Sequence, residues 1–347
     1  MKQPHVFGHL PDGTEVLAVG ICSGAFSCEI LTYGAALRTM IVPDRNGKPT
    51  DIVLGFDRLE DYLAHDAHFG GTIGRFANRI RGGRFTLGGV SYTLPCNDGG
   101  NHLHGGPMGF DRVPWEIERL EEHAVALSLH SADGDMGYPG AMDVRVTYSL
   151  QDASLAIRYD AVCDRDTLCS LTNHAYWNLS GHDAGDVLGQ FLRLDAAQYT
   201  PSDPSLLPTG ALAPVAGTPM DFTAPMPIGA RIDSGFEALR LAGGYDHNYV
   251  IDRPDFAQAW SAETGISLAV TTDRPGVQLY TGNFLGHTPS GKGGARYPKY
   301  GGFCLETQAF PDAPNQSAFP SAVLHAGERF ESITTYRFGV MGKGGSE

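Results

Sequence analysis

The chain has 347 residues, including 45 Gly and 22 Pro, and this share of helix-breaking residues excludes an architecture of long helices. Hydrophobic residues make up 42% and charged residues 18%, a composition that can bury a substantial core and differs from that of disordered proteins. The formal net charge of −14 repels phosphate backbones and anionic headgroups, so we expect neither nucleic acid nor membrane partners.

Targeting signals are not apparent in the sequence. Residues 1–11 lack the apolar core of a signal peptide, and no apolar run reaches the length of about 18 residues that a membrane span requires. We therefore expect a cytoplasmic protein. The six cysteines are far apart and form no C-x-x-C pair, so we expect buried, reduced thiols rather than disulfides or a zinc site. They are Cys22, Cys28, Cys96, Cys163, Cys169 and Cys304.

Alternating apolar and polar residues predict short strands along most of the chain. The strongest helical signal is short, at Phe56–Ala64. Gly88 and Gly89 separate two strands of a predicted hairpin, because two glycines accommodate the positive φ angles of a tight turn. In chain order, the predicted strands are 15–19, 26–32, 52–54, 84–87, 90–94, 124–130, 142–150, 154–162, 168–172, 266–271, 277–281, 303–306 and 333–340.

A second predicted hairpin joins 142–150 to 154–162, and each of its strands carries apolar residues on one face. Many short strands with Gly- and Pro-rich turns favour an antiparallel β-sandwich or barrel. We expect one domain over residues 1–347, with the Pro-rich segment 201–227 as an ordered excursion and Gly342–Glu347 as a frayed tail.

Two residues are suited to proton transfer. Glu306 ends an apolar run, where burial would raise its pKa and make it a usable base near neutral pH; the alternative is a carboxylate neutralised by an arginine. His174 follows the predicted strand at 168–172, and it is either an acid–base group or a core histidine with satisfied nitrogens.

Other polar residues have less specific surroundings. His102 and His104 form an H-x-H pair, but the nearest downstream carboxylates, Asp111 and Glu116, do not give the close spacing of a metal site, and we predict none. His104 alone is either structural or a site residue. Asp246 is suited to a turn or to a site, and Gln278 could simply face solvent. The sequence contains neither a phosphate-binding glycine loop nor a G-x-S-x-G nucleophile elbow.

Five ordered segments resemble the aldose 1-epimerase family. They are GRFANRI at 74–80, NHLHGG with GFD and Trp115 at 101–115, TNHAYWNLSG at 172–181, YDHNY at 245–249 and LETQAFPDAPN at 305–315. The resemblance covers roughly residues 5–340 in the family order.

This resemblance implies an all-β fold, a single large antiparallel sandwich of the galactose mutarotase type with an open sugar cleft and few short helices. It implies interconversion of the α and β anomers of a free aldohexose, without a cofactor. The oligomeric state, monomer or homodimer, is left open by the sequence. Glu306 would be the general base that removes the proton of the anomeric hydroxyl. His174 would be the general acid that protonates the ring oxygen. General acid–base catalysis by one such group accelerates a reaction by about 10²–10⁴-fold.

The resemblance also implies sugar-binding roles for six residues. Asp246 would bridge ring hydroxyls, Arg79 and His104 would donate hydrogen bonds to the sugar, and Gln278 would line the cleft, together with Asn78 and Tyr176. Trp177 stands where an aromatic residue permits stacking on the sugar.

Two alternatives remain open. One is a non-catalytic carbohydrate-binding module, which would not need the His174 and Glu306 pair. The other is a hexose-6-phosphate epimerase, which would need basic residues at the cleft mouth, such as Arg75, Arg79 and Arg81. The preferred aldose, among galactose, glucose, xylose and arabinose, is not set by the sequence.

Overall fold

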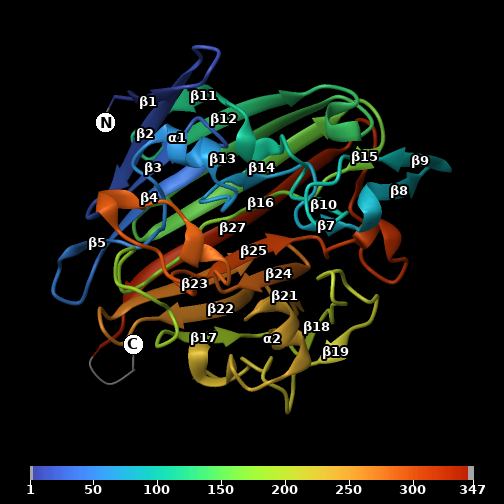
Figure 1. The fold of residues 1–347 in the computed structure, drawn as a ribbon. Coiled ribbons are helices and arrows are strands. Elements are labelled where there is room, and N and C mark those ends of the chain that lie inside the picture. Colours follow the sequence, from blue (N-terminus) through green and yellow to red (C-terminus); the bar gives the residue numbers. More distant parts are fainter. Residues whose placement is uncertain (1–2, 343–347) are drawn as a thin grey trace.

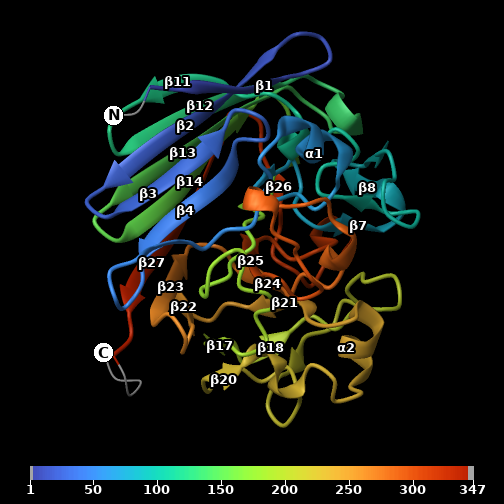
Figure 2. The ribbon, with the colours of Figure 1, turned by 60° about the vertical axis from the view of Figure 1, so that its left-hand side comes forward.

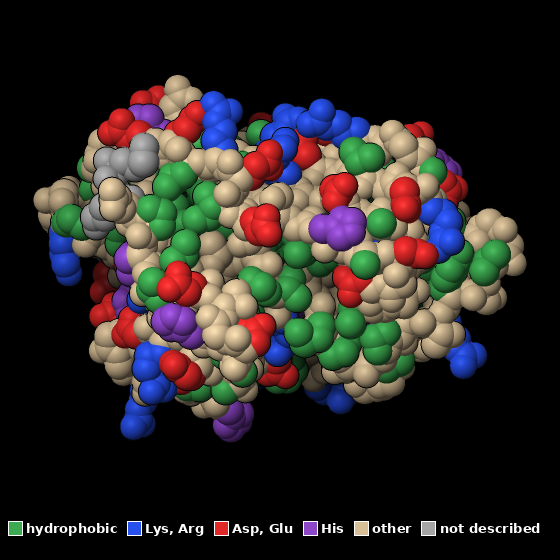
Figure 3. All heavy atoms as spheres, turned by 90° about the horizontal axis from the view of Figure 1, so that it is seen from above, with side chains coloured by type: hydrophobic (Ala, Val, Ile, Leu, Met, Phe, Trp, Pro, Cys, Tyr) green, Lys and Arg blue, Asp and Glu red, His purple; other side chains and the backbone are tan. Residues whose placement is uncertain are grey.

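The computed structural model describes residues 3–342, most of which belong to antiparallel strands and the turns between them (Figure 1). Its two α-helices are short, α1 (Leu59–Ala64) and α2 (Glu237–Ala242). Over the described range, no helix is long and apolar enough to cross a membrane. Apart from Gly342, the tail predicted to fray lies outside the described residues. Acidic and basic side chains are spread over the face seen in Figure 3.

The largest sheet has nine antiparallel strands in the order β11-β12-β13-β14-β27-β23-β22-β17-β20. Its centre contains the predicted hairpin, in which the register runs unbroken from Met142 opposite Cys163 to Gln151 opposite Ser154. The apolar residues of one face of each strand are buried, as the alternation predicts. The strands are β11 (Glu116–Leu120), β12 (Ala124–Ser131), β13 (Met142–Gln151), β14 (Ser154–Cys163), β17 (Phe191–Leu194), β20 (Met226–Pro227), β22 (Asp255–Trp260), β23 (Ile266–Thr272) and β27 (Arg329–Val340).

Two five-stranded sheets accompany the large sheet. The N-terminal one lies over β12 and β13, and Figure 2 shows the two layers side by side. The second, in the order β19-β18-β21-β24-β25, lies along the other half of the large sheet. The strands are β1 (His5–His9), β2 (Glu15–Ser23), β3 (Phe26–Leu31), β4 (Ala36–Pro43) and β5 (Pro49–Asp51), then β18 (Gln198–Tyr199), β19 (Ala213–Pro214), β21 (Asp246–Val250), β24 (Gly276–Tyr280) and β25 (Cys304–Gln308).

Four two-stranded pairs accompany the larger sheets. Two of them, β16 with β6 and β15 with β26, join segments far apart in the chain. The predicted hairpin around Gly88 and Gly89 is confirmed as β8 and β9. The pairs are β6 (Thr72–Ile73) with β16 (Thr172–Asn173), β7 (Arg79–Ile80) with β10 (His102–Leu103), β8 (Arg84–Leu87) with β9 (Val90–Thr93), and β15 (Thr167–Leu168) with β26 (Val323–Leu324).

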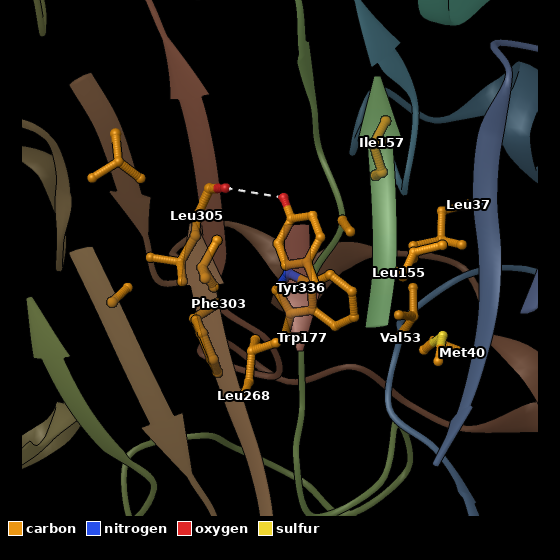
Figure 4. Packing of buried hydrophobic residues seen from close by; sticks show 14 of the residues in the cluster. Leu37, Met40, Val53, Leu155, Ile157, Trp177, Leu268, Phe303, Leu305 and Tyr336 are labelled. Carbon is orange, nitrogen blue, oxygen red and sulfur yellow. Dashed lines mark hydrogen bonds between the residues drawn. The ribbon is translucent and has the colours of Figure 1, made fainter. Parts of the chain in front are cut away.

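The described residues form three hydrophobic clusters, and the one with the most residues lies between the sheets, so the predicted β-sandwich is confirmed. Figure 4 shows its centre, where Trp177 packs on Tyr336 with ring centroids 4.9 Å apart. The Tyr336 hydroxyl donates to the carbonyl of Leu305 at 3.5 Å and so connects β27 to β25. Trp177 is fully buried in this core, so the expectation that it could stack on a sugar is wrong.

Several local predictions need correction. The strand predicted at 52–54 is a single bridge from Val53 to Trp177, and the helix predicted from Phe56 begins at Leu59 because Phe56 packs into the core. The strand predicted at 168–172 is divided between β15 and β16. The Pro-rich segment is ordered as predicted, with Leu207 and Phe222 buried.

Gly70 connects the N-terminal sheet to the loop that carries His174. Its N–H donates to the carbonyl of His174 at 3.0 Å, and its own carbonyl accepts from the N–H of Leu37 at 2.9 Å. Its φ is +65°, and a Cβ at this position would lie 2.0 Å from the carbonyl oxygen of Leu37. Glycine is therefore required both by backbone conformation and by space.

We expect Gly70→Ala to destabilise the protein far more than Gly88→Ala. Gly88 has a similar φ of +57° but nothing within 4 Å of its Cβ position, so alanine there costs only the left-handed backbone, about 1–2 kcal/mol. Thermal or urea unfolding of both variants tests this difference. Equal losses of stability would show that the contact with Leu37 does not constrain the fold.

Candidate active site

A cleft of about 720 Å³ opens beside the second five-stranded sheet, within the size range of small-molecule sites. Its walls come from β21, β25 and the loops next to β6, β7, β10 and β16. The structure thereby brings together residues separated by up to about two-thirds of the chain. Of the predicted site residues, Asn78, Arg79, His104, His174, Tyr176, Asp246 and Glu306 line this cleft.

The register of the sheet places the acidic residues of the cleft. Glu306 on β25 lies opposite Gln278 on β24, which in turn lies opposite Asn248 on β21. Because side chains alternate along a strand, Asp246 shares the face of Asn248 and approaches Gln278 diagonally. Gln278 donates to Asp246 Oδ1 at 2.7 Å. Gln278 is not among the lining residues, so it supports Asp246 from behind rather than lining the cleft as predicted.

Glu306 and His174 form a buried pair on the cleft floor. Glu306 Oε2 lies 3.6 Å from His174 Nε2, and the two residues are only 1% and 4% exposed. Glu306 Oε2 is buried without a hydrogen-bond partner. Among residues 3–342, no arginine or lysine forms an ion pair with Glu306, so the alternative of a carboxylate neutralised by arginine does not describe this site.

Burial shifts the two pKa values of this pair in opposite directions. It raises the pKa of Glu306 well above its usual range, and the like charge of Asp246 raises it further, while Arg79 partly opposes both. Burial lowers the pKa of His174 to about 3, with a further contribution from His68. A single proton on the pair therefore resides on the carboxyl group in the unliganded protein, and both groups are then neutral.

Cys304 lies beneath His174, with Sγ 3.6 Å from Nδ1. This contact occupies Nδ1 and leaves Nε2 for Glu306 and a ligand. All six cysteines are free, but Cys96 is exposed and Cys22 half-buried, so the expectation of buried thiols is wrong for these two.

His104 faces the pair from the loop after β10. Its Nδ1 accepts the backbone N–H of Asn78 at 3.2 Å, so the neutral ring carries its proton on Nε2, as a donor. Burial lowers the pKa of His104 well below its usual range, which keeps the ring neutral. His104 and Asn78 both have positive φ, +53° and +67°, a strained conformation that concentrates at functional sites.

Arg79 and Tyr176 complete the predicted set. Arg79 Nε donates to Asp98 Oδ2 at 2.7 Å, which fixes the guanidinium next to the cleft. The ring of Tyr176 packs 5.0 Å from that of His174 and 5.9 Å from that of Tyr280. These contacts limit the rotation of His174 and leave its edge toward the cleft.

The H-x-H pair of His102 and His104 does not form a common site in the structure. His102 uses Nδ1 on the carbonyl of Pro95 and Nε2 on the hydroxyl of Tyr138, both at 2.7 Å, and it does not line the cleft. The closest grouping of potential ligand atoms is instead on His104, His174 and Glu306, which lie within 4.8 Å of one another. This grouping can exchange protons with a bound ligand or hold a cation.

Sequence reasoning missed His68, which lines the cleft and whose Nδ1 donates to Asp111 Oδ2 at 2.7 Å. Asp111 lies in the GFD segment of the family resemblance, but its side chain was considered only as a metal ligand. No short motif contains His68, and its partner is 43 residues away, so nothing local in the sequence indicates the pair.

Taken together, the cleft has one acid–base pair, several fixed hydrogen-bonding groups and an opening to solvent. Such a set can bind a hydroxylated molecule and transfer protons to and from adjacent oxygens.

The family model of aldose 1-epimerase matches residues 18–337. Galactose mutarotase of Rattus norvegicus is 42% identical over 96% of this chain and 98% of its own length. Aldose 1-epimerase of Escherichia coli is 36% identical over 94% of this chain and 96% of its own length. A crystal structure of an aldose epimerase homologue from C. elegans superposes with a TM-score of 0.86 at 33% identity, covering 94% of this chain and 99% of that one. The chain therefore belongs to the aldose 1-epimerase family.

Proposed function

We propose that this protein interconverts the α and β anomers of free aldohexoses such as D-glucose and D-galactose. The observation that carries this proposal is the buried pair of Glu306 and His174, with 3.6 Å between Oε2 and Nε2, on the floor of an open polar cleft. The names of the relatives, galactose mutarotase and aldose 1-epimerase, support it.

The reaction requires two proton transfers at neighbouring oxygens. In the reactive complex the shared proton has moved from Glu306 to His174. The carboxylate of Glu306 then accepts the proton of the anomeric hydroxyl, and protonated His174 donates its proton to the ring oxygen. As the carbonyl forms at C1, the electron pair of the bond between C1 and the ring oxygen moves to that oxygen, and the ring opens to the aldehyde. Rotation about the C1–C2 bond and closure on the other face reverse both transfers.

The electrostatics of the pair favour the product of ring opening. After the two transfers, Glu306 is a neutral acid and His174 a neutral imidazole. These are the forms that burial favours, since it raises the pKa of Glu306 and lowers that of His174. The cleft thus supplies one proton that moves between the two groups through the sugar, and no net charge needs to enter or leave.

The remaining predicted residues would hold the sugar while its ring opens. Asp246, supported by Gln278, is placed to accept hydrogen bonds from ring hydroxyls. Arg79, held by Asp98, and His104, through Nε2, are placed to donate. Asn78 and Tyr176 would complete the wall of the cleft.

The alternatives have less support. A binding module would gain nothing from burying a carboxyl and an imidazole side by side, which has an energetic cost. A phosphorylated sugar would need free basic groups, but the guanidinium of Arg75 is buried among carbonyls of 131–140, and Arg81 pairs with Asp203. Arg79 and Arg112 line the cleft, but Arg79 pairs with Asp98 and Arg112 lies 4.0 Å from Asp111.

We expect Glu306→Gln and His174→Asn each to lower kcat for mutarotation by about 10²–10⁴, because each removes one proton-transfer group. Polarimetry of freshly dissolved α-D-glucose, with the buffer rate subtracted, measures this. Glu118→Gln, on exposed β11, is the matched control and should keep the wild-type rate. The rate with glucose 6-phosphate is measured in the same way, because a higher rate with it would favour a hexose-6-phosphate epimerase. A metal chelator should leave the rate with glucose unchanged. A variant at 306 or 174 with wild-type kcat would remove that residue from its role.

A second prediction concerns the pH profile of kcat/KM. The pair is active with one proton, so activity is lost as pH rises through the pKa of Glu306. Asp246 raises this pKa and Arg79 lowers it. Asp246→Asn should therefore move the alkaline limb to lower pH, and Arg79→Gln should move it to higher pH.

Both substitutions also weaken sugar binding, and the opposite directions of the two shifts separate the electrostatic effect from that loss. Shifts in the same direction, or unmoved limbs, would contradict the assignment of the titrating proton to Glu306.

A further inference from the structure

His68 occupies the cleft without a role in the proton transfers described above. It lies in the loop between α1 and β6, and its φ of +56° is in the left-handed region that few non-glycine residues adopt. Two other cleft residues, Asn78 and His104, share this conformation. The fold therefore maintains strain at His68 as it does at two predicted sugar-binding positions.

Asp111 fixes the orientation of the His68 ring. His68 Nδ1 lies 2.7 Å from Asp111 Oδ2, and the side chains are 12% and 5% exposed. A carboxylate only accepts, so Nδ1 carries the proton, and Nε2 is the ring nitrogen left for a ligand. Asp111 Oδ2 also lies 4.0 Å from Arg112 Nε, and the other carboxylate oxygen, Asp111 Oδ1, is buried without a partner.

His68 packs beside the two other histidines of the cleft, His104 and His174. Its ring centroid is 4.9 Å from that of His104 and 5.5 Å from that of His174. The charges that act on Glu306 are those of Asp246 and Arg79, whereas those that act on His174 are those of His68 and Asp111. Asp246 and Arg79 therefore neighbour Glu306, whereas His68 and Asp111 neighbour His174.

The connectivity of a pyranose indicates which substituent of the sugar would lie near His68. The ring oxygen is bonded to C1, which carries the anomeric hydroxyl, and to C5, which carries the exocyclic CH₂OH of a hexose. With Glu306 at the anomeric hydroxyl and His174 at the ring oxygen, the next substituent beyond His174 is the one on C5. The side of the cleft that contains His68 is where this substituent would lie.

We propose that His68, oriented by Asp111, hydrogen-bonds the C6 hydroxyl through Nε2 and so favours hexoses over pentoses. This inference rests on the proposed function, because the roles of Glu306 and His174 set the direction of the sugar ring. It concerns the choice among aldoses, which the proton transfers themselves do not determine.

The test compares sugars that differ only at C5. D-Xylose is D-glucose without the CH₂OH group, and L-arabinose is related to D-galactose in the same way. In His68→Asn, asparagine tolerates the positive φ but lacks Nε2. We expect the ratio of kcat/KM for glucose over xylose to fall about 3- to 10-fold, the effect of one lost hydrogen bond, with the same trend for galactose over arabinose.

A matched control is available on the nine-stranded sheet. His130 Nδ1 lies 2.7 Å from Asp143 Oδ1 on β12 and β13, an exposed histidine–aspartate pair that does not line the cleft. His130→Asn should leave both ratios unchanged. If His68→Asn does not fold, His68→Gln is the second variant, and circular dichroism establishes the folding of each.

Equal losses on glucose and xylose, or an unchanged ratio, would overturn the assignment of His68. If the wild type accelerates neither sugar, the proposed function fails instead. Calorimetric affinities for glucose and xylose then still test the contact, with the same fall in ratio expected for His68→Asn. An unchanged affinity ratio, or absence of binding by the wild type, would overturn it.

Discussion

Glu306 and His174 lie side by side beneath an open cleft, nearly excluded from water and without a lysine or arginine ion pair to Glu306 within residues 3–342. Under this constraint neither group carries a charge at low cost, because burial raises the pKa of the carboxyl and lowers that of the imidazole. Together they hold one proton whose position is easily changed by a ligand. The sugar chemistry proposed for the site, the roles of the neighbouring charges and the need for a rigid floor all derive from this arrangement.

The fold holds Glu306 and its neighbours on strands, whereas His174 lies on the loop after β16. Glu306, Gln278 and Asp246 are set by the register of three neighbouring strands, and Tyr336 fastens β25 to the large sheet from below. The opposite wall consists of loops, but short bridges and the Gly70 contacts hold them, and they accommodate left-handed residues at His104 and His68. Glu306 is thus held by the sheet register, and His174 and the facing wall by contacts between loops.

The sequence predicts the parts of this design that depend on local pattern. The hairpin of β13 and β14 alternates cleanly because one face of it is buried, and the motifs around His174 and Glu306 carry the family resemblance. β21 was missed because it is buried on both faces, so Asp246 looked equally suited to a turn. Trp177 was predicted to face the sugar, and His68 was not predicted as a site residue, for the same reason. Their partners are far away in the chain: Tyr336 is 159 residues from Trp177, and Asp111 is 43 residues from His68. Pairing at that distance leaves no periodicity to detect.

Infrared difference spectroscopy of the wild type against Glu306→Gln, recorded as a function of pH, reports the protonation of this one carboxyl directly. The account predicts a protonated carboxyl band that persists far above the ordinary glutamate pKa of 4.5 and decreases when an aldose binds. Asp246→Asn should lower the pH at which the band disappears. A Glu306 that is already ionised near pH 4.5, with no change on adding sugar, would contradict the claim that burial holds the catalytic proton on this pair.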